Sequence, residues 1–293
     1  MQEFKYFAPY NITEALKILD SAVGQKKLLA GGTDLIIALK NKQVRPNAVI
    51  DLKNIEELNY IKSDNGYIRI GSMTTFTDIV ESELIKSQAR VLHESCEVMG
   101  SPQIRNLATI GGNIVNASPA ADSVPALLVL DAEVKLESVL GVRVLKVQDI
   151  LQGINKTNLK ENEVLTEISF KVPSENAVTG FRKLGRRAAL SIARLSVACV
   201  LEAEDNTTRC GDIRIALGAV AKNPFRATGA EEVLKGKDLS LKLIDECVER
   251  ISDIAVKTIG NRPSLPFKRQ SIKGISRELL NRLYNEIGQK RRR

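Results

Sequence analysis

The sequence predicts an α+β chain of mixed helices and strands that folds into two domains. Three observations support this prediction. The chain has 293 residues, more than one domain usually holds. Strand-like and helix-like patterns of apolar residues follow one another along its length. Pro173-Ser-Glu-Asn176 interrupts these patterns with the composition of a linker. The first domain is therefore predicted over residues 1–173 and the second over residues 177–289.

The first domain divides into subdomains near residue 56, because the pattern changes from Glu57 onward. The subdomain over residues 1–56 has a strand–loop–helix–strand order, which is compact enough to form a subdomain of its own. Its predicted elements are a helix at Tyr10–Val23 capped by Thr13, a strand at Lys27–Ala30, a helix capped by Thr33 and Asp34 that runs to about Leu39, and a strand at Ala48–Leu52.

The subdomain over residues 57–173 contains two hairpin signals. Asp64-Asn-Gly66 separates two strand patterns and has the residues that tight hairpin turns prefer. Gly141 separates another pair. The predicted strands are Leu58–Lys62, Tyr67–Ile70, Ala132–Ser138, Val142–Lys146 and Val164–Val172, and the predicted helices are Thr75–Glu81, Leu84–Met99 and Ala126–Leu130.

The second domain is predicted as strands followed by amphipathic helices. The strands are Leu195–Leu201 and Ile213–Val220, and the helices are Ala230–Lys235, Leu241–Ile259 and Ser271–Ile287. Residues 290–293, Lys290-Arg-Arg-Arg293, form a basic tail.

Composition excludes several classes of function. Apolar residues make up 43% and charged residues 27% of the chain, as in ordinary globular proteins. No apolar run has membrane-spanning length, and the N-terminus lacks the layout of a signal peptide, so we expect a cytoplasmic protein. The net charge of +8 owes much to the tail, and no aromatic residues alternate with the basic ones, so we do not expect nucleic-acid binding.

The cysteines and the histidine also narrow the chemistry. Cys96, Cys199, Cys210 and Cys247 are scattered, without the close spacing of zinc or iron–sulfur ligands. His93 is the only histidine and no nucleophile motif lies beside it, which disfavours a catalytic triad. Without an acid–base pair in the chain, we expect a bound cofactor to carry the chemistry.

Two Gly-Gly pairs are the main candidate site. Leu28–Leu35 contains the first pair and Ala108–Asp122 the second. Glycine allows backbone N–H groups to approach a phosphate closely, so the two stretches suggest two loops that close on one anionic ligand. Neither stretch fits the Rossmann or P-loop patterns. We therefore infer a flavin-binding electron-transfer protein.

Each stretch also has a purely structural interpretation. The first stretch is either a phosphate-binding loop that uses the Thr33 hydroxyl or a simple tight turn. In the second stretch, Asp122 either binds hydroxyl groups of a cofactor or caps the helix that follows. The basic stretch Phe181–Arg187 is either a solvated run of charge or a border of the flavin, with Lys183 or an arginine meeting the flavin or a dinucleotide's phosphates.

Four stretches together resemble the FAD-binding medium subunit of the molybdenum hydroxylases. They are Leu28–Leu35, Ser101–Asn106, Thr109–Asn113 and Ala117–Asp122. The family includes the flavin subunits of bacterial xanthine, nicotinate and carbon monoxide dehydrogenases. The resemblance covers nearly the whole chain. It implies a vanillyl-alcohol-oxidase (PCMH-type) FAD-binding domain of two α+β subdomains, followed by a smaller α/β domain like that of carbon monoxide dehydrogenase flavoproteins.

The resemblance also assigns cofactor contacts. It implies that Met99 and Leu165 lie near the flavin ring, although Met99 differs from the aromatic residue of animal relatives, and that Asp122 binds the hydroxylated chain of FAD. Lys183 falls in the basic stretch of the family. The pyrophosphate loop is expected to consist of Leu28, Leu29, Ala30, Gly31, Gly32, Thr33, Asp34 and Leu35, and the second loop to use Thr109, Gly112 and Asn113.

The function implied is electron transfer within a complex. A large subunit with the molybdenum cofactor hydroxylates the substrate, and a small subunit passes electrons from its [2Fe-2S] clusters to non-covalent FAD on this chain. The acceptor is NAD or another molecule, and a dimer of heterotrimers is expected. Xanthine is the first choice of substrate, with nicotinate or carbon monoxide as alternatives. A stand-alone flavin oxidase and a non-catalytic scaffold are the competing classes.

Overall fold

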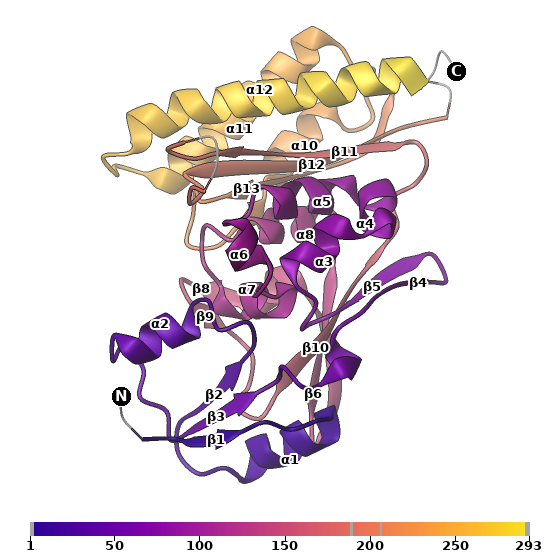
Figure 1. The fold of residues 1–293 in the computed structure, drawn as a ribbon. Coiled ribbons are helices and arrows are strands. Elements are labelled where there is room, and N and C mark those ends of the chain that lie inside the picture. Colours follow the sequence, from indigo (N-terminus) through magenta and orange to yellow (C-terminus); the bar gives the residue numbers. More distant parts are fainter. Residues whose placement is uncertain (1–2, 188–189, 206, 291–293) are drawn as a thin grey trace. The chain divides into compact units, whose positions relative to one another are not determined.

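The computed structural model describes residues 3–187, 190–205 and 207–290 (Figure 1). It divides into two units. The first comprises the described residues of Met1–Ser82, Ser101–Ala117 and Ala132–Phe170, and the second comprises those of Glu83–Gly100, Ser118–Asp131 and Lys171–Arg293. Of the basic tail, Lys290 ends the last helix and residues 291–293 lie outside the described residues. No helix among the described residues is long and apolar enough to cross a membrane.

A three-stranded parallel sheet begins the first unit. Its strand order is β1-β3-β2, and Leu28 in β2 lies opposite Ile50 in β3. The first helix is capped by Asn11, whose side chain accepts a hydrogen bond from the Glu14 N–H at 2.8 Å. The prediction of Thr13 as the cap was wrong, because Asn11 is the residue with extended backbone before the first turn. The elements are β1 (Lys5–Phe7), α1 (Ile12–Ser21), β2 (Lys26–Leu29), α2 (Leu35–Lys40) and β3 (Ala48–Asp51).

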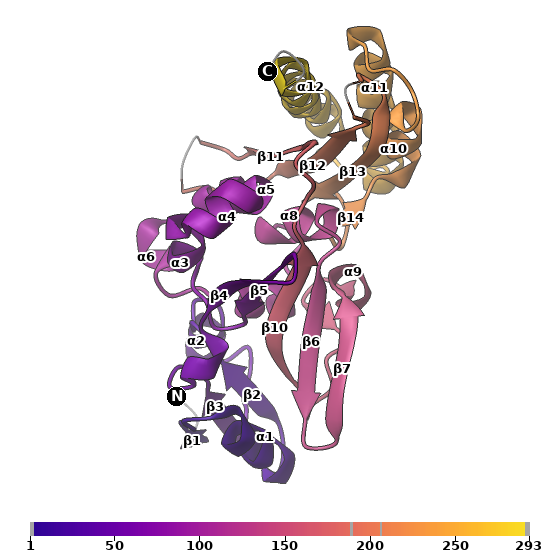
Figure 2. The ribbon, with the colours of Figure 1, turned by 90° about the vertical axis from the view of Figure 1, so that its right-hand side faces the viewer.

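A five-stranded sheet also belongs to this unit, in the order β4-β5-β10-β6-β7 (Figure 2). Both predicted hairpins are confirmed as antiparallel pairs. Asn65 and Gly66 have positive φ angles of 50° and 78°, as a tight hairpin turn requires. The strands are β4 (Ile61–Asp64), β5 (Tyr67–Gly71), β6 (Glu133–Ser138), β7 (Gly141–Lys146) and β10 (Val164–Lys171).

Short elements complete the first unit. Two of them, α6 and α7, carry the second glycine stretch and the residues before it. The elements are η1 (Glu56–Leu58), α3 (Phe76–Glu81), α6 (Pro102–Arg105), α7 (Ile110–Asn116), α9 (Val147–Ile150), β8 (Leu151–Gly153) and β9 (Lys156–Thr157).

The second unit is an antiparallel sheet with helices on both faces (Figure 1). Alternate residues of β12, such as Val197 and Cys199, belong to the core formed with α10, α11 and α12. On the other face, α5 contacts β11, and α8 contacts β12 and β13. The elements are α4 (Glu83–Gln88), α5 (Arg90–Glu97), α8 (Ser123–Val129), β11 (Ala177–Leu184), β12 (Leu195–Ala203), β13 (Cys210–Gly218), β14 (Phe225–Arg226), α10 (Thr228–Leu234), α11 (Leu241–Ile259) and α12 (Leu265–Lys290).

Two predictions for this unit need correction. The single helix predicted over Leu84–Met99 is two helices, because Ala89, between α4 and α5, leaves the helical conformation at φ −139°. Strand β11 was not predicted at all, because its end carries the basic residues that resemble a solvated run of charge.

Candidate functional site

The two glycine stretches lie in direct contact. A Cβ atom placed on Gly31 would lie only 1.7 Å from the carbonyl oxygen of Leu107, so backbone packs against backbone at this point. A Cβ atom on Gly112 would lie 3.4 Å from Cβ of Ala30, which is ordinary van der Waals contact. Only glycine permits the approach at residue 31. The structure therefore brings together the two stretches that the sequence analysis singled out.

The first stretch presents a row of unpaired backbone donors. The N–H groups of Gly31, Gly32, Thr33, Asp34 and Leu35 have no hydrogen-bond acceptor among the described residues. The next N–H along the chain, that of Ile36, bonds to the Gly32 carbonyl at 3.1 Å. Gly32 has a φ angle of +72°, which turns the loop sharply. Successive free N–H groups at a turn of this kind form a concavity for anions.

Asp34 does not cap the helix that follows. It occupies the N-cap position of α2, but its side chain makes no capping hydrogen bond, and it is exposed. Thr33 Oγ1 lies 3.5 Å from Asp34 Oδ2 and does not cap α2 either. The expectation that these two residues cap the helix was therefore wrong. Within the part of the chain that the structure describes, the first N–H group of α2 has no acceptor, which favours an external anion.

The second stretch has a different construction. Gly111 N–H donates to the Ser72 carbonyl at 2.9 Å, and Gly112 N–H donates to Thr109 Oγ1 at 3.1 Å. Thr109 is only 3% exposed and acts as the N-cap of α7. Asn113 N–H also bonds within the turn, to the Thr109 carbonyl. These backbone donors are already engaged, so the second stretch supports the first loop and contributes any ligand contacts mainly through side chains.

Asp122 and Lys183 form a buried ion pair in the second unit. The Lys183 Nζ lies 2.6 Å from Asp122 Oδ2 and also donates to the Val98 carbonyl at 3.0 Å. Burial raises the pKa of Asp122 to about 6, and the lysine opposes this rise. The carboxyl group does not cap α8, and its Oδ1 atom is buried without a hydrogen-bond partner among the described residues. This unsatisfied acceptor suits a ligand hydroxyl.

The two residues predicted near the flavin ring, Leu165 and Met99, lie in different units. Leu165 is buried in β10, opposite Leu136, in the unit that holds the glycine loops. Met99 is buried just after α5, in the unit that holds Asp122 and Lys183, and it follows Val98, which accepts the lysine hydrogen bond.

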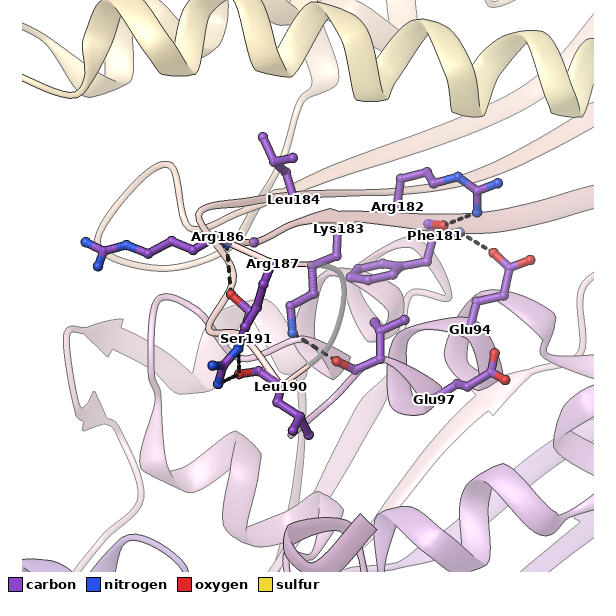
Figure 3. Close-up of a pocket in the computed structure, with 12 residues that line it drawn as sticks. Glu94, Glu97, Phe181, Arg182, Lys183, Leu184, Arg186, Arg187, Leu190 and Ser191 are labelled. Atoms are coloured by element: carbon purple, nitrogen blue, oxygen red, sulfur yellow. Dashed lines mark hydrogen bonds between the residues drawn. The ribbon is translucent and has the colours of Figure 1, made fainter. Parts of the chain in front are cut away.

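The basic stretch after Phe181 lines a cavity of about 610 Å³ (Figure 3). Lys183 points inward and is buried, whereas Arg186 and Arg187 are exposed. The exposed Arg186 and Arg187 thus fit a solvated run of charge, and a flavin contact of Lys183 stays a prediction. The lining comprises Glu94, Glu97, Val98, Phe181, Arg182, Lys183, Leu184, Gly185, Arg186, Arg187, Leu190 and Ser191.

Comparisons with known proteins agree with these features. The profile described as "FAD binding domain in molybdopterin dehydrogenase" matches residues 2–174, and "CO dehydrogenase flavoprotein C-terminal domain" matches residues 180–283. The chain belongs to the FAD-binding medium subunits of the molybdenum hydroxylases. The resemblance stated from the sequence and the fold class that it implied are thereby confirmed.

Relatives of this medium subunit differ in substrate. It is 33% identical over 291 residues to the nicotinate dehydrogenase FAD-subunit of Eubacterium barkeri, covering 98% of each chain. It is 30% identical over 268 residues to the xanthine dehydrogenase FAD-binding subunit of Escherichia coli O157:H7, covering 91% of each. A solved carbon monoxide dehydrogenase from Hydrogenophaga pseudoflava, lacking the Mo-pyranopterin moiety of its cofactor, matches with a TM-score of 0.90 and 28% identity over 97% of this chain and 98% of that one.

The residues of this medium subunit fit FAD. Free N–H groups at Gly31–Leu35 suit the negative pyrophosphate, and the unpaired Oδ1 of Asp122 suits a hydroxyl of the ribityl or ribose part. Glu94 was not predicted from the sequence, although it lines the cavity and accepts a hydrogen bond from the Phe181 N–H. No local signal marks Glu94, because its partners lie far away along the chain.

Proposed function

We propose that this medium subunit is the electron-transfer subunit of a molybdenum hydroxylase, which takes electrons from an iron–sulfur subunit and passes them to NAD or another acceptor. The single observation that carries the proposal is the row of five backbone N–H groups at Gly31–Leu35 that find no acceptor among the described residues, held in place by the contact of Gly31 with Leu107. When bound there, FAD would supply the redox chemistry.

The residues of the chain bind and orient the cofactor. With FAD bound, the N–H groups of the first loop would donate hydrogen bonds to the pyrophosphate, and the bond from Gly112 N–H to Thr109 Oγ1 fixes the neighbouring turn. Asp122 would accept a hydrogen bond from a hydroxyl group of FAD through Oδ1, while Lys183 pairs with its other oxygen. These interactions hold FAD without a covalent bond.

The cysteines support the assignment of the iron–sulfur clusters to a partner. All four are buried, and burial raises the pKa of Cys210 and Cys247 to about 12 and that of Cys199 well above its ordinary value. Cluster ligands are thiolates, so Cys199, Cys210 and Cys247, whose raised pKa values keep them protonated at neutral pH, are poorly suited to that role. We therefore propose [2Fe-2S] clusters on a small subunit and the molybdenum cofactor on a large one, in a dimer of heterotrimers.

The large subunit would contact the substrate. The medium subunits of relatives named for nicotinate and for xanthine share more than nine-tenths of their length with this chain, so we propose a nitrogen heterocycle of that kind as the substrate. The two differ little in identity to this chain, and the large subunit decides between them.

The experiment is purification of the full chain followed by absorption spectroscopy and titration with FAD. We expect a yellow protein, or a colourless one that takes up one FAD per chain, and co-purification with molybdenum- and iron-containing subunits from its own cells. Protein that neither contains nor takes up FAD would refute the proposal. FAD binding with oxidase turnover and without partner subunits would favour the stand-alone flavin oxidase instead.

A further inference from the structure

Three hydrogen bonds join strand β11 to helix α5 and to Val98, the residue directly after this helix. The Val91 N–H donates to Thr179 Oγ1 at 3.2 Å, and the Phe181 N–H donates to Glu94 Oε2 at 2.8 Å. The third bond runs from Lys183 Nζ to the Val98 carbonyl at 3.0 Å. Glu94 and Phe181 face each other in Figure 3. The bond from Phe181 has a charged carboxylate as its acceptor, and it holds the backbone of β11 two residues before Lys183.

Glu94 is itself held by arginines. Arg282 on α12 binds both carboxylate oxygens, with distances of 2.9 and 2.8 Å, and Arg90 donates to Oε1 at 2.9 Å. The Glu94 side chain is 17% exposed. Burial alone would raise its pKa, but the hydrogen bonds from Arg282 and the Phe181 N–H, with the charges of both arginines, lower the pKa below its ordinary value. Glu94 is therefore a fixed, ionised acceptor at neutral pH.

The guanidinium of Arg282 reaches Glu94 by passing over Gly180. A Cβ atom on Gly180 would lie 2.0 Å from Arg282 Nη2 and 2.9 Å from Leu279 Cδ1. Any side chain at residue 180 would displace the arginine from this path. Gly180 directly precedes Phe181, whose N–H donates to Glu94. The space left at Gly180 therefore lets Arg282 reach the glutamate that holds the next residue of β11.

We propose that Glu94 is a positioning residue which, clamped by Arg282 across Gly180, fixes β11 so that Lys183 stays against Asp122. Lys183 has a long, flexible side chain, so the position of its backbone decides whether the ammonium reaches the buried carboxylate. When the ammonium is displaced, Asp122 keeps its burial but loses its counter-charge, and its carboxyl group becomes neutral at pH 7. The last helix of the chain thus controls the charge of the residue proposed to bind FAD.

The part of this inference that concerns FAD rests on the proposed function, whereas the part that concerns the ionisation of Asp122 does not. The first measurement is therefore made on the full chain freed of FAD. Carbon-13 NMR of labelled aspartate carboxyl groups follows the titration of Asp122, whose signal is assigned with Asp122→Asn. In Arg282→Met we expect the titration midpoint of Asp122 to move upward from about 6 by roughly two pH units, a hundredfold change in proton affinity, as the loss of a nearby opposite charge can produce.

The matched control is Arg277→Met. Arg277 also lies on α12 and pairs with Asp245 on α11 at 2.7 Å, away from β11. We expect no movement of the Asp122 midpoint in this variant. Gly180→Ala should also displace Arg282 from Glu94 and raise the Asp122 midpoint. The double variant Gly180→Ala/Arg282→Met should raise this midpoint little further, because both changes remove the same interaction between Arg282 and Glu94. A midpoint unchanged in both Arg282→Met and Gly180→Ala, with folding retained, would overturn the inference.

The second measurement is the affinity for FAD as a function of pH. In Arg282→Met we expect roughly tenfold weaker binding at pH 7 and recovery towards wild-type affinity at pH 9, where Asp122 ionises again. A purely structural role would weaken binding equally at every pH, and that result would overturn the inference. Failure of the wild-type chain to bind FAD would instead refute the proposed function, while the carboxyl titration would still decide the role of Glu94.

Discussion

Replacing Gly31 with alanine should separate the two glycine stretches. The new Cβ atom would lie 1.7 Å from the Leu107 carbonyl oxygen and 2.5 Å from its carbon, and ordinary van der Waals contact begins at 3.4 Å. The contact must therefore open by about 1.7 Å, and because both partners are backbone, no side-chain rotation relieves the clash. Gly31 needs no positive φ, so the effect is purely steric.

A displacement of this size removes the phosphate contacts of the loop. N–H···O hydrogen bonds span only about 2.7–3.2 Å, and a hydrogen bond to a charged group contributes about 1.5–3 kcal/mol. Losing two of them weakens FAD binding by about a hundredfold or more. Flavin-free full-length protein is titrated with FAD, and the quenching of flavin fluorescence gives the dissociation constant.

Gly274→Ala is the matched control. Gly274 is exposed on α12, and nothing lies within 4 Å of the position its Cβ would take. This change should leave FAD affinity unchanged and should stabilise the helix slightly. If Gly31→Ala binds FAD within about threefold of this control and melts at the same temperature, the contact between the two stretches does not shape the phosphate loop.

Three further predictions follow from the buried carboxylates. Asp122→Asn should weaken FAD binding about tenfold and leave the fold intact, as judged by circular dichroism, whereas the exposed control Asp253→Asn should change neither. FAD affinity should fall as the pH drops through about 6, and affinity independent of pH between 5 and 8 would contradict the assignment. The FAD-free fold should show the opposite dependence, because burial raises the pKa of Asp122 from 3.8. The stability that Asp122 gives this fold should be greatest below pH 4 and lost as the pH rises through 6. Arg143→Met should lower the free energy of unfolding by about 2 kcal/mol at pH 7, because it leaves Glu163 buried without its cation. The loss should be smaller at pH 4, because the lowered pKa of Glu163 gives stability that is present above pH 4.5 and lost as the pH falls. Equal urea midpoints for the variant and the wild type at pH 7 would refute this prediction.

Most of the secondary structure could be predicted from local sequence patterns. The hairpin at Asn65 and Gly66 follows from residues that tolerate positive φ, and the helix predicted at Leu241–Ile259 begins and ends where α11 does. These elements depend on neighbours along the chain, so the sequence shows them directly. Each glycine stretch could also be recognised from the sequence, because its glycines and polar residues are neighbours along the chain.

The features that the sequence did not show depend on distant partners. Strand β11 ends in basic residues, and only the structure shows that Lys183 is buried against Asp122. Glu94 carries no motif, and its partner Arg282 lies near the other end of the chain. Asp122 resembles a helix cap until its unpaired Oδ1 is located. Such contacts arise from tertiary packing, which a single sequence does not specify residue by residue.

The division into domains shows the same limit. The boundary at residues 173–177 stays a prediction from linker composition. In the structure, Glu83–Gly100 and Ser118–Asp131 group with the C-terminal residues, although the sequence places them before the linker. Helices α5 and α8 contact strands of the C-terminal sheet, and contacts of this kind leave no periodic signal in the sequence.

The most direct test of the central claim is nitrogen-15 NMR of the backbone amides during titration with FAD. If the first glycine loop holds the pyrophosphate, the amide signals of Gly31, Gly32, Thr33 and Asp34 should move downfield together and saturate at one FAD per chain. If FAD binds with equal stoichiometry while these four signals stay in place, the free N–H groups of the loop do not hold the cofactor.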